Sequence, residues 1–483
     1  MKVATRKRSS PQFDLLYAEL CRQLEDGTLQ PTQRVPQEMV LARQYSISRG
    51  TVRKVLASLA ERGVIDREPG RRRFVNEPSR VSPRARRGLT GTLRVLTYWP
   101  TLQADNIARL TAAFNGAFPG VKVEMLRIHS QEQHDEVVRL CSEGNPPDVV
   151  HVPGQHLDAL CEAVPVVPMQ EMLDADALES IYPAVRDATS IDGRQVAYPL
   201  TSSPIMLAYN RTHFEEAGLS FPDETWTSQT WIEAIDRLAV NGPGSERRYG
   251  FAFAPSVRRW GALIAQAGGA AATDWRKTPA MTVQGVAEAC QFAYDLSQRP
   301  SVIRGIEISA EEMFSQGIAS MVLCSLTGLK QLMSREFETD VAPVPFGPKP
   351  GTLLLASGFV VPQMSRNAAL GRQFIRFVSS SEVQTILRCS GAGIPPLRQV
   401  AENMQFASEF VHPRGYASFT RSLDHAYSFQ RGSDAEIEKV TTALFGKFLM
   451  GLLKANELCA QVDGILEARL QERSLLQKED HHG

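Results

Sequence analysis

The stretch SISRGTVRKVLASL, residues 46–59, decides how the N-terminal part of this chain folds. Its apolar residues recur at the spacing of one helical face: Val52, Val55, Leu56 and Leu59. Arg49, Arg53 and Lys54 project from the other side of the same helix, and Ser48 stands at the N-cap position. A helix with a buried back and a cationic front suits the major groove of DNA, but the stretch alone fits an ordinary amphipathic surface helix equally well.

The sequence on either side of this stretch favours a DNA-binding helix over an ordinary surface helix. Leu16, Leu20 and Leu24 predict a first helix, and a second short helix is expected over residues 37–45. The turn at residues 45–47 then leads into the cationic helix, which we expect to run to about Arg62. Two strand-like runs follow, VIDRE and RFVNE, joined by a basic tip. This order predicts a helix-turn-helix with a β-hairpin wing.

The charge distribution agrees with that reading. The 483 residues carry no net charge, but residues 1–90 hold 19 Lys and Arg against 9 Asp and Glu. The head is therefore basic and the remaining chain acidic, and a basic head is typical of proteins that bind phosphate backbones.

The run LYAELCRQLEDGTLQPTQRVPQEMVLARQYSISRGTVRKVLASLAERGVIDREPGRRRFV, residues 16–75, resembles the winged helix-turn-helix of the GntR family of bacterial transcription regulators. Carried over by position, the resemblance implies that seven residues contact double-stranded operator DNA: Arg34, Ser48, Arg49, Thr51, Arg53, Arg71 and Arg72. The chain departs from the family at Met39, where an arginine is usual, and at the wing tip, where GRRR stands in place of glycines. The resemblance also implies a homodimer on two half-sites.

Residues 78–90, PSRVSPRARRGLT, read as a semi-extended linker between the head at 11–77 and an effector domain at 91–475. Strand-like and helical runs alternate from TLRVLTYW through IARLTAAFNGAF, VKVEML and HDEVVRLCSE to PDVVHVP. Such alternation predicts a parallel sheet covered by helices, with a binding site at the carboxyl ends of the strands.

The continuation resembles, in order, the family 1 extracellular solute-binding proteins. The similarity is carried by PGVKVEM, GNPPDVVHV, IMLAYNRTHFEEAGL, EEMFSQGIASMVL and GFVVPQMSRNAALGRQFIRFV, among other segments. It implies a multidomain chain in which a two-lobe α/β domain of the type II periplasmic-binding-protein class follows the winged helix-turn-helix. Lobe one is expected at about 91–200 and 341–398, and lobe two at about 204–338 and 399–475.

Residue patterns inside this domain add two local predictions. VAYPLTSSPIMLAYN is β-like but contains Pro199 and Pro204, which predicts a strand pair bent at a hinge. Thr230 and Glu233 have capping-box spacing at a helix start, so Trp231 is expected to be structural.

A sugar site needs aromatic faces surrounded by hydrogen-bonding groups. By correspondence with the solute-binding family, the residues expected in the cleft are Trp99, Gln155, Thr201, Ser202, Ser203, Arg258, Trp260, Ser325, Thr327, Ser357 and Gly358. Trp99 and Trp260 are the expected stacking faces, with lobe-core tryptophan as the alternative. Val152, Ser203 and Thr327 stand where an aromatic or acidic residue is often found, which leaves room for a smaller ligand than an oligosaccharide.

Other functions lack sequence support. The seven cysteines show no CxxC spacing and no zinc pattern, so we expect free thiols and no metal or cofactor. GxSxG and phosphate-loop motifs are absent, and no apolar run follows the basic N-terminus as in a secretory signal.

The chain is therefore expected to be a cytoplasmic regulator and not an enzyme, with no membrane segment, whose operator binding is controlled by a small solute, most simply a sugar. Two alternatives remain open at this point: a transport-type solute-binding protein with a vestigial head, and a fusion to a pyridoxal-phosphate enzyme, for which no Schiff-base lysine motif is found.

Overall fold

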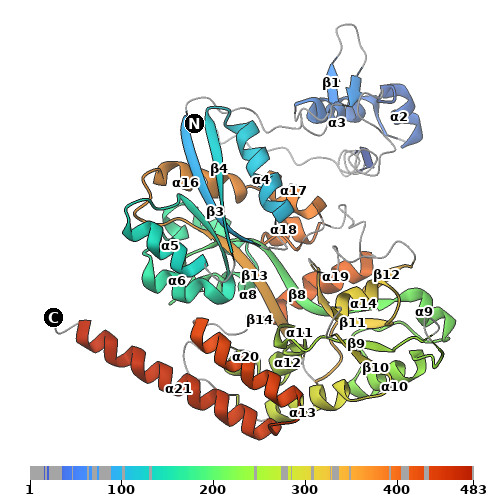
Figure 1. Cartoon of the computed structure of the whole chain (residues 1–483). Helices are drawn as coiled ribbons and strands as arrows, with labels where there is room; N and C mark the ends of the chain where they lie inside the picture. The colour runs from blue at the N-terminus through green and yellow to red at the C-terminus, as the bar shows by residue number, and fades with distance from the viewer. Residues whose placement is uncertain are drawn as a thin grey trace. The chain divides into compact units, whose positions relative to one another are not determined.

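A computed structural model of the chain describes residues 16, 19–20, 35–45, 47–61, 65–67, 73–75, 89–99, 104–129, 133–243, 247–273, 281–283, 285–305, 309–326, 328, 337–347, 350–390, 393–403, 413–428 and 435–480. The described residues up to Val75 form the head, and those from residue 89 onward form the α/β domain (Figure 1).

The head contains the predicted helix-turn-helix and wing. Helix α2 spans Glu38–Gln44, α3 spans Arg49–Glu61, and the strands β1 (Ile65–Arg67) and β2 (Arg73–Val75) pair antiparallel. The four apolar residues of the cationic helix are buried together with others from the neighbouring elements: Leu16, Leu20, Val35, Leu41, Ile47, Val52, Val55, Leu56 and Leu59. Of the expected first helix, only residues 16, 19 and 20 lie among the described residues.

The α/β domain begins with the predicted alternation of strands and helices. Its first part consists of β3 (Gly91–Trp99), α4 (Ala104–Ala117), β4 (Val121–His129), α5 (Gln133–Ser142), β5 (Val149–Pro153), η3 (Gly154–His156), α6 (Leu157–Ala163), η4 (Met169–Glu171), α7 (Ala175–Glu179), α8 (Pro183–Ala188), β6 (Ser190–Ile191), β7 (Arg194–Gln195) and β8 (Tyr198–Asn210). Strands β3 and β5 are parallel, as the pattern predicted.

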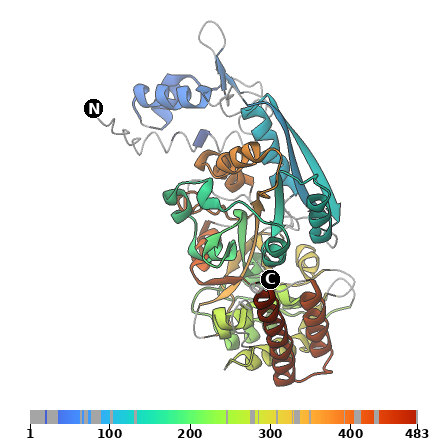
Figure 2. The same cartoon turned by 90° about the vertical axis from the view of Figure 1, so that its left-hand side faces the viewer.

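The second part of the domain returns to the same sheet. It consists of α9 (Arg211–Glu216), α10 (Ser228–Leu238), β9 (Phe251–Phe253), α11 (Val257–Trp260), α12 (Ala262–Thr273), α13 (Val286–Ser297), β10 (Val302–Arg304), α14 (Ala310–Ser315), β11 (Met321–Ser325), β12 (Thr339–Ala342), β13 (Thr352–Val360), α16 (Ala368–Val378), α17 (Ser381–Ser390), α18 (Arg398–Ala401), α19 (Pro413–Ser422), η6 (Leu423–His425), β14 (Ala426–Ser428), α20 (Ala435–Leu449) and α21 (Ala455–Asp480). Helices α20 and α21 lie side by side in both views (Figures 1 and 2).

One mixed sheet connects the two parts of the domain. Within the described residues its strand order is β10-β9-β11-β8-β13-β5-β3-β4, with β12 also paired to β8 and β14 to β13. The central strands β8 and β13 are antiparallel to each other. Strand β8 pairs with β13 through its first half and with β11 through its second half, while β13 also pairs with β5. These two strands are therefore the connection between the halves of the sheet.

Two separate apolar cores lie on either side of that connection. The first contains residues between Leu96 and Ala197 together with Val360. The second contains residues between Ile205 and Leu353 and, from the C-terminal helices, residues between Ile437 and Leu466. Ala342, Val344 and Leu353, which follow the lobe boundary expected at residue 341, also pack in this second core.

The two local predictions need correction. The segment with Pro199 and Pro204 is one continuous strand, β8, and not a strand pair. Strand β8 tolerates Pro199 because the register of its pairing with β13 is irregular there, between Ser357 and Gly358. The start of α10 is set by a capping box of Thr227 and Thr230, three residues earlier than expected, while Trp231 is fully buried as predicted.

Among the described residues, no helix is both long enough and apolar enough to cross a membrane.

Candidate DNA-binding surface and ligand site

The cationic face of α3 is exposed, and its first turn is capped. The backbone N–H of Thr51 donates a hydrogen bond of 3.1 Å to Ser48 Oγ, which confirms Ser48 as the N-cap. Arg49 is exposed, and so is Arg53, whose side chain has a relative exposure of 62%. A capped helix start with two exposed guanidinium groups can present backbone and side-chain donors to DNA phosphates.

Arg53 also has a partner within the head. Its guanidinium donates hydrogen bonds of 3.3 and 3.2 Å to Glu38 Oε2, which joins α3 to α2. An exposed pair of this kind contributes little to stability but orients the side chain. The other expected DNA contacts, Arg34, Arg71 and Arg72, lie outside the described residues, although the wing strands on either side of the tip are formed.

The serines and threonine expected in a ligand cleft come together at the crossing of β8 and β13. Thr201 lies opposite Ser357 in the register, and Ser202 and Ser203 follow on β8. Ser325 ends β11 opposite Ile205. The structure therefore places these residues at the connection between the two halves of the sheet.

Protein groups already bind most of these hydroxyls. Ser202 Oγ donates to Ile394 O at 3.2 Å, and Ser203 Oγ accepts a hydrogen bond of 2.7 Å from the N–H of Leu326. Ser325 Oγ accepts one of 3.2 Å from the N–H of Gly328. Four of the residues, Thr201, Ser202, Ser203 and Ser325, are at most 4% exposed. In this conformation Ser202 joins β8 to the segment around Ile394, Ser203 joins β8 to the residue that follows β11, and Ser325 bonds locally to Gly328.

Ser357 is bound by a residue that the sequence did not indicate, His151 on β5. The two nitrogens of His151 lie 2.9 Å from Ser357 Oγ and 3.3 Å from Thr97 Oγ1. Its ring stacks on Tyr98 with 5.1 Å between centroids, and Gln133 Nε2 donates to its backbone oxygen. Burial lowers the pKa of His151 to about 3, so the imidazole is neutral and can donate one hydrogen bond and accept one.

Gly358 allows a close approach of strands. A Cβ atom at this position would lie 2.7 Å from the backbone oxygen of Tyr198 on β8, closer than carbon and oxygen pack without displacement. Gln155 is half-buried in η3, next to Gly154, where a Cβ would lie 3.2 Å from Ala356 O on β13. Both residues thus flank the same crossing.

Of the two expected aromatic faces, Trp260 lies away from the crossing. Trp260 is 1% exposed and packs in the second core against Phe445 and Phe448, with ring centroids 5.5 and 6.2 Å away. The structure therefore agrees with the alternative of a lobe-core tryptophan for this residue. Trp99 is the last residue of β3, and its side chain and Thr327 lie outside what the structure describes. Arg258, on α11, is half-buried.

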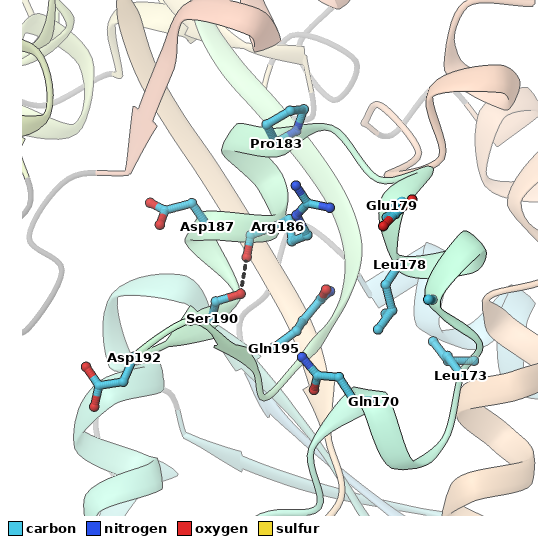
Figure 3. A pocket seen from close by; sticks show the side chains of 12 residues that line it. Gln170, Leu173, Leu178, Glu179, Pro183, Arg186, Asp187, Ser190, Asp192 and Gln195 are labelled. Atoms are coloured by element: carbon cyan, nitrogen blue, oxygen red, sulfur yellow. Dashed lines mark hydrogen bonds between the residues drawn. The ribbon is translucent and has the colours of Figure 1, made fainter.

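A hollow of about 800 Å³ lies elsewhere in the first part of the domain. It is enclosed by η4, α7, α8 and the β6–β7 hairpin (Figure 3). Its lining residues are Gln170, Leu173, Ala175, Leu178, Glu179, Pro183, Arg186, Asp187, Ser190, Asp192, Gly193 and Gln195. The sequence carried no motif for this pocket, because its walls come from short segments whose spacing follows no regular period.

Comparisons with known families match both parts of the chain. Residues 14–75 match the family described as bacterial regulatory proteins, gntR family. Residues 109–412, more than half of the chain, match the family described as bacterial extracellular solute-binding protein.

Curated relatives match the head alone. The HTH-type transcriptional repressor NagR of Bacillus subtilis is 38% identical over 80 residues, which cover 17% of this chain and 32% of the relative. The uncharacterized HTH-type transcriptional regulator YurK of the same organism is 34% identical over 70 residues, 14% of this chain and 29% of the relative. The chain thus spans about a third of the length of these relatives.

Solved structures match the α/β domain. The substrate-binding protein Lmo0181 of Listeria monocytogenes, in complex with cycloalternan, has a TM-score of 0.68 at 16% identity, covering 79% of this chain and 100% of that one. The sugar-binding protein MalE of Xanthomonas citri has a TM-score of 0.67 at 17% identity, covering 80% and 99%. At these identities the likeness shows the two-lobe solute-binding fold and no ligand.

Proposed function

We propose that this chain, which belongs to the bacterial extracellular solute-binding protein family and carries a GntR-type DNA-binding domain in front of that fold, is a transcription regulator whose binding to operator DNA responds to a small solute. The proposal rests on the presence of a GntR-type DNA-binding domain and a solute-binding fold in one chain. A capped, cationic helix precedes a domain in which the long paired strands β8 and β13 connect the two apolar cores.

A sugar or polyol is the proposed effector. The supporting observation is that solved structures with this fold include proteins with bound cycloalternan, maltose and D-mannitol. In this chain Gln155, Thr201, Ser357 and the residues around them provide hydroxyl and amide groups at the β8–β13 crossing. Hydroxyl-rich ligands are bound by such groups.

The proposed mechanism is a shift between two lobe arrangements. A solute that contacts both lobes stabilises the arrangement in which it makes more contacts, and only this difference in affinity can move the equilibrium. The serine hydroxyls at the crossing would exchange partners as the lobes move. In a homodimer, such a shift would change the spacing of two recognition helices and hence the fit to two half-sites. Because the proposed partner is DNA, we propose that the protein acts in the cytoplasm.

The first experiment tests the head. An operator sequence is first selected from a random duplex DNA library by its binding to the full chain. The affinity for this operator is then measured at several salt concentrations for wild type and for the double variant Arg49→Ala, Arg53→Ala. Each lost phosphate contact lowers the salt slope by about 0.9, so we expect a slope smaller by about 1.8 and weaker binding.

The control removes the same charge from the α/β domain with Lys447→Ala and Lys454→Ala, two exposed lysines. We expect its salt slope to equal that of wild type. If the arginine variant keeps the wild-type affinity and slope, α3 is not the DNA-reading helix.

The second experiment tests the effector. The melting temperature of the full chain is measured with a panel of sugars and polyols, because a ligand that binds only the folded state raises it. Each hit is then added to the operator-binding assay. A ligand that stabilises the protein and leaves operator affinity unchanged would contradict the regulatory coupling.

A further inference from the structure

The pocket in the first part of the α/β domain is separate from the residues at the β8–β13 crossing. It lies between η4–α7 on one side and α8 with the β6–β7 hairpin on the other. Figure 3 shows the guanidinium of Arg186 and the carboxamide of Gln195 directed into the space bounded by Leu178, with Glu179 and Gln170 at its edges. Its volume of about 800 Å³ is within the range of small-molecule sites.

Gln195 contributes a buried side-chain oxygen that has no hydrogen-bond donor among the described residues. The residue is 2% exposed, and its Nε2 donates a hydrogen bond of 3.3 Å to Ala197 O. A buried acceptor without a donor costs roughly 1–3 kcal/mol. The terminal amide torsion of glutamine is soft, so a small rotation would present this oxygen to a donor in the pocket.

Three further polar side chains of the pocket have free hydrogen-bonding groups in the described structure. Within the described part of the chain, no side-chain hydrogen bond or ion pair is formed by Arg186, Glu179 or Gln170. Arg186 bonds through its backbone: its N–H donates to Tyr182 O at 2.9 Å, and its oxygen accepts from Ser190 Oγ at 2.6 Å. Together these groups supply donors from Arg186 and Gln170 and acceptors from Glu179 and Gln195.

The lining chemistry selects a class of ligand. Arg186 is accompanied by three carboxylates, Glu179, Asp187 and Asp192, so an anionic ligand would meet net repulsion. The described lining residues include no aromatic ring on which a pyranose face could stack. Hydroxyl groups, which both donate and accept, match the mixture of unused donors and acceptors.

The pocket is connected to the β8–β13 crossing through the backbone. Val196 N and Ala197 N, which follow Gln195, both donate to Thr189 O, and β8 begins at Tyr198. On the other side, the N–H before α8 at Tyr182 donates to Pro396 O, and Ile394 of the same segment pairs with Ser202. A ligand held by α8 and the hairpin would therefore be linked through the backbone to two points of β8, its start at Tyr198 and Ser202.

We propose that this pocket is a second ligand site, one that binds a small uncharged polyol through Arg186, Glu179, Gln170 and Gln195. It does not depend on the DNA-binding role of the head or on the ligand of the crossing. Gln195 Oε1 accepts a hydroxyl proton of the ligand, and Arg186 donates to neighbouring hydroxyls.

The test uses the full chain with three probes, D-mannitol, D-sorbitol and D-glucose, each titrated into the millimolar range. Melting temperature and calorimetric binding are measured for wild type, Arg186→Met, Gln195→Leu and the control Arg194→Met, whose side chain is exposed on the same hairpin and does not line the pocket. Hydrogen exchange with and without the polyol locates the binding. Circular dichroism checks that each variant is folded.

We expect at least one polyol to raise the melting temperature of wild type and Arg194→Met and to slow exchange in residues 170–195. Loss of the hydrogen bonds from Arg186 should weaken this binding by about tenfold or more. The proposal is overturned if neither D-mannitol nor D-sorbitol binds wild type, if Arg186→Met and Gln195→Leu bind them as tightly as wild type, or if the protection from exchange lies outside residues 170–195.

Discussion

Replacing His151 by glutamine should make the stability of the α/β domain less sensitive to acid. In the folded protein the pKa of His151 is lowered to about 3 by burial, while an unfolded histidine titrates near 6.5. Between these values the unfolded state binds the proton and the folded state does not, so stability falls as the pH falls. At about pH 5 the linkage amounts to about 2 kcal/mol relative to neutral pH.

The variant should therefore be less stable than wild type near pH 7, because the bonds to Ser357 and Thr97 are lost, and the gap should narrow by about 2 kcal/mol towards pH 5. Urea unfolding followed by tryptophan fluorescence suits this assay, because all five tryptophans lie beyond residue 90. The spectroscopic signal then reports on the α/β domain and not on the head.

The matched control is Thr97→Val, which removes one of the two bonds and leaves the imidazole in place. We expect its stability gap to wild type to be the same at both pH values. A gap for His151→Gln that stays constant from neutral pH to pH 5 would refute the view that the folded protein holds His151 neutral.

Further predictions concern backbone geometry and capping. In the same urea assay, Gly358→Ala should destabilise the chain by about 1–3 kcal/mol, because the added Cβ would clash with Tyr198 O. Gly464→Ala should stabilise it by about 0.5–1 kcal/mol, because this glycine lies inside α21 with open space around it. Ser48→Ala should cost the head about 0.5–2 kcal/mol by removing the cap of α3, seen as weaker operator binding at unchanged salt slope. Asp463→Asn should destabilise by about 1–3 kcal/mol, because its carboxylate accepts two backbone N–H groups at 2.7 and 3.0 Å; unchanged unfolding would show that the amide replaces it fully.

The sequence by itself was sufficient for the elements whose signal is local. The period of Val52, Val55, Leu56 and Leu59 and the cap at Ser48 are properties of a single turn-by-turn pattern, and the structure confirms both. The strand and helix order from β3 to β5 is likewise confirmed. Such patterns are readable because the residues that determine them are at most a few positions apart.

Tertiary structure alone decided the environment of the site residues. The sequence placed Ser357 in a cleft, but its hydrogen bond to His151 joins residues more than two hundred positions apart. Trp260 is a core residue because Phe445 and Phe448 from α20 pack against it. The pocket around Gln195 likewise depends on how η4, α7 and α8 are brought together. The burial, the hydrogen-bond partners and the pKa of a side chain are set by its neighbours in space. The order of residues along the chain does not show which distant residues become those neighbours.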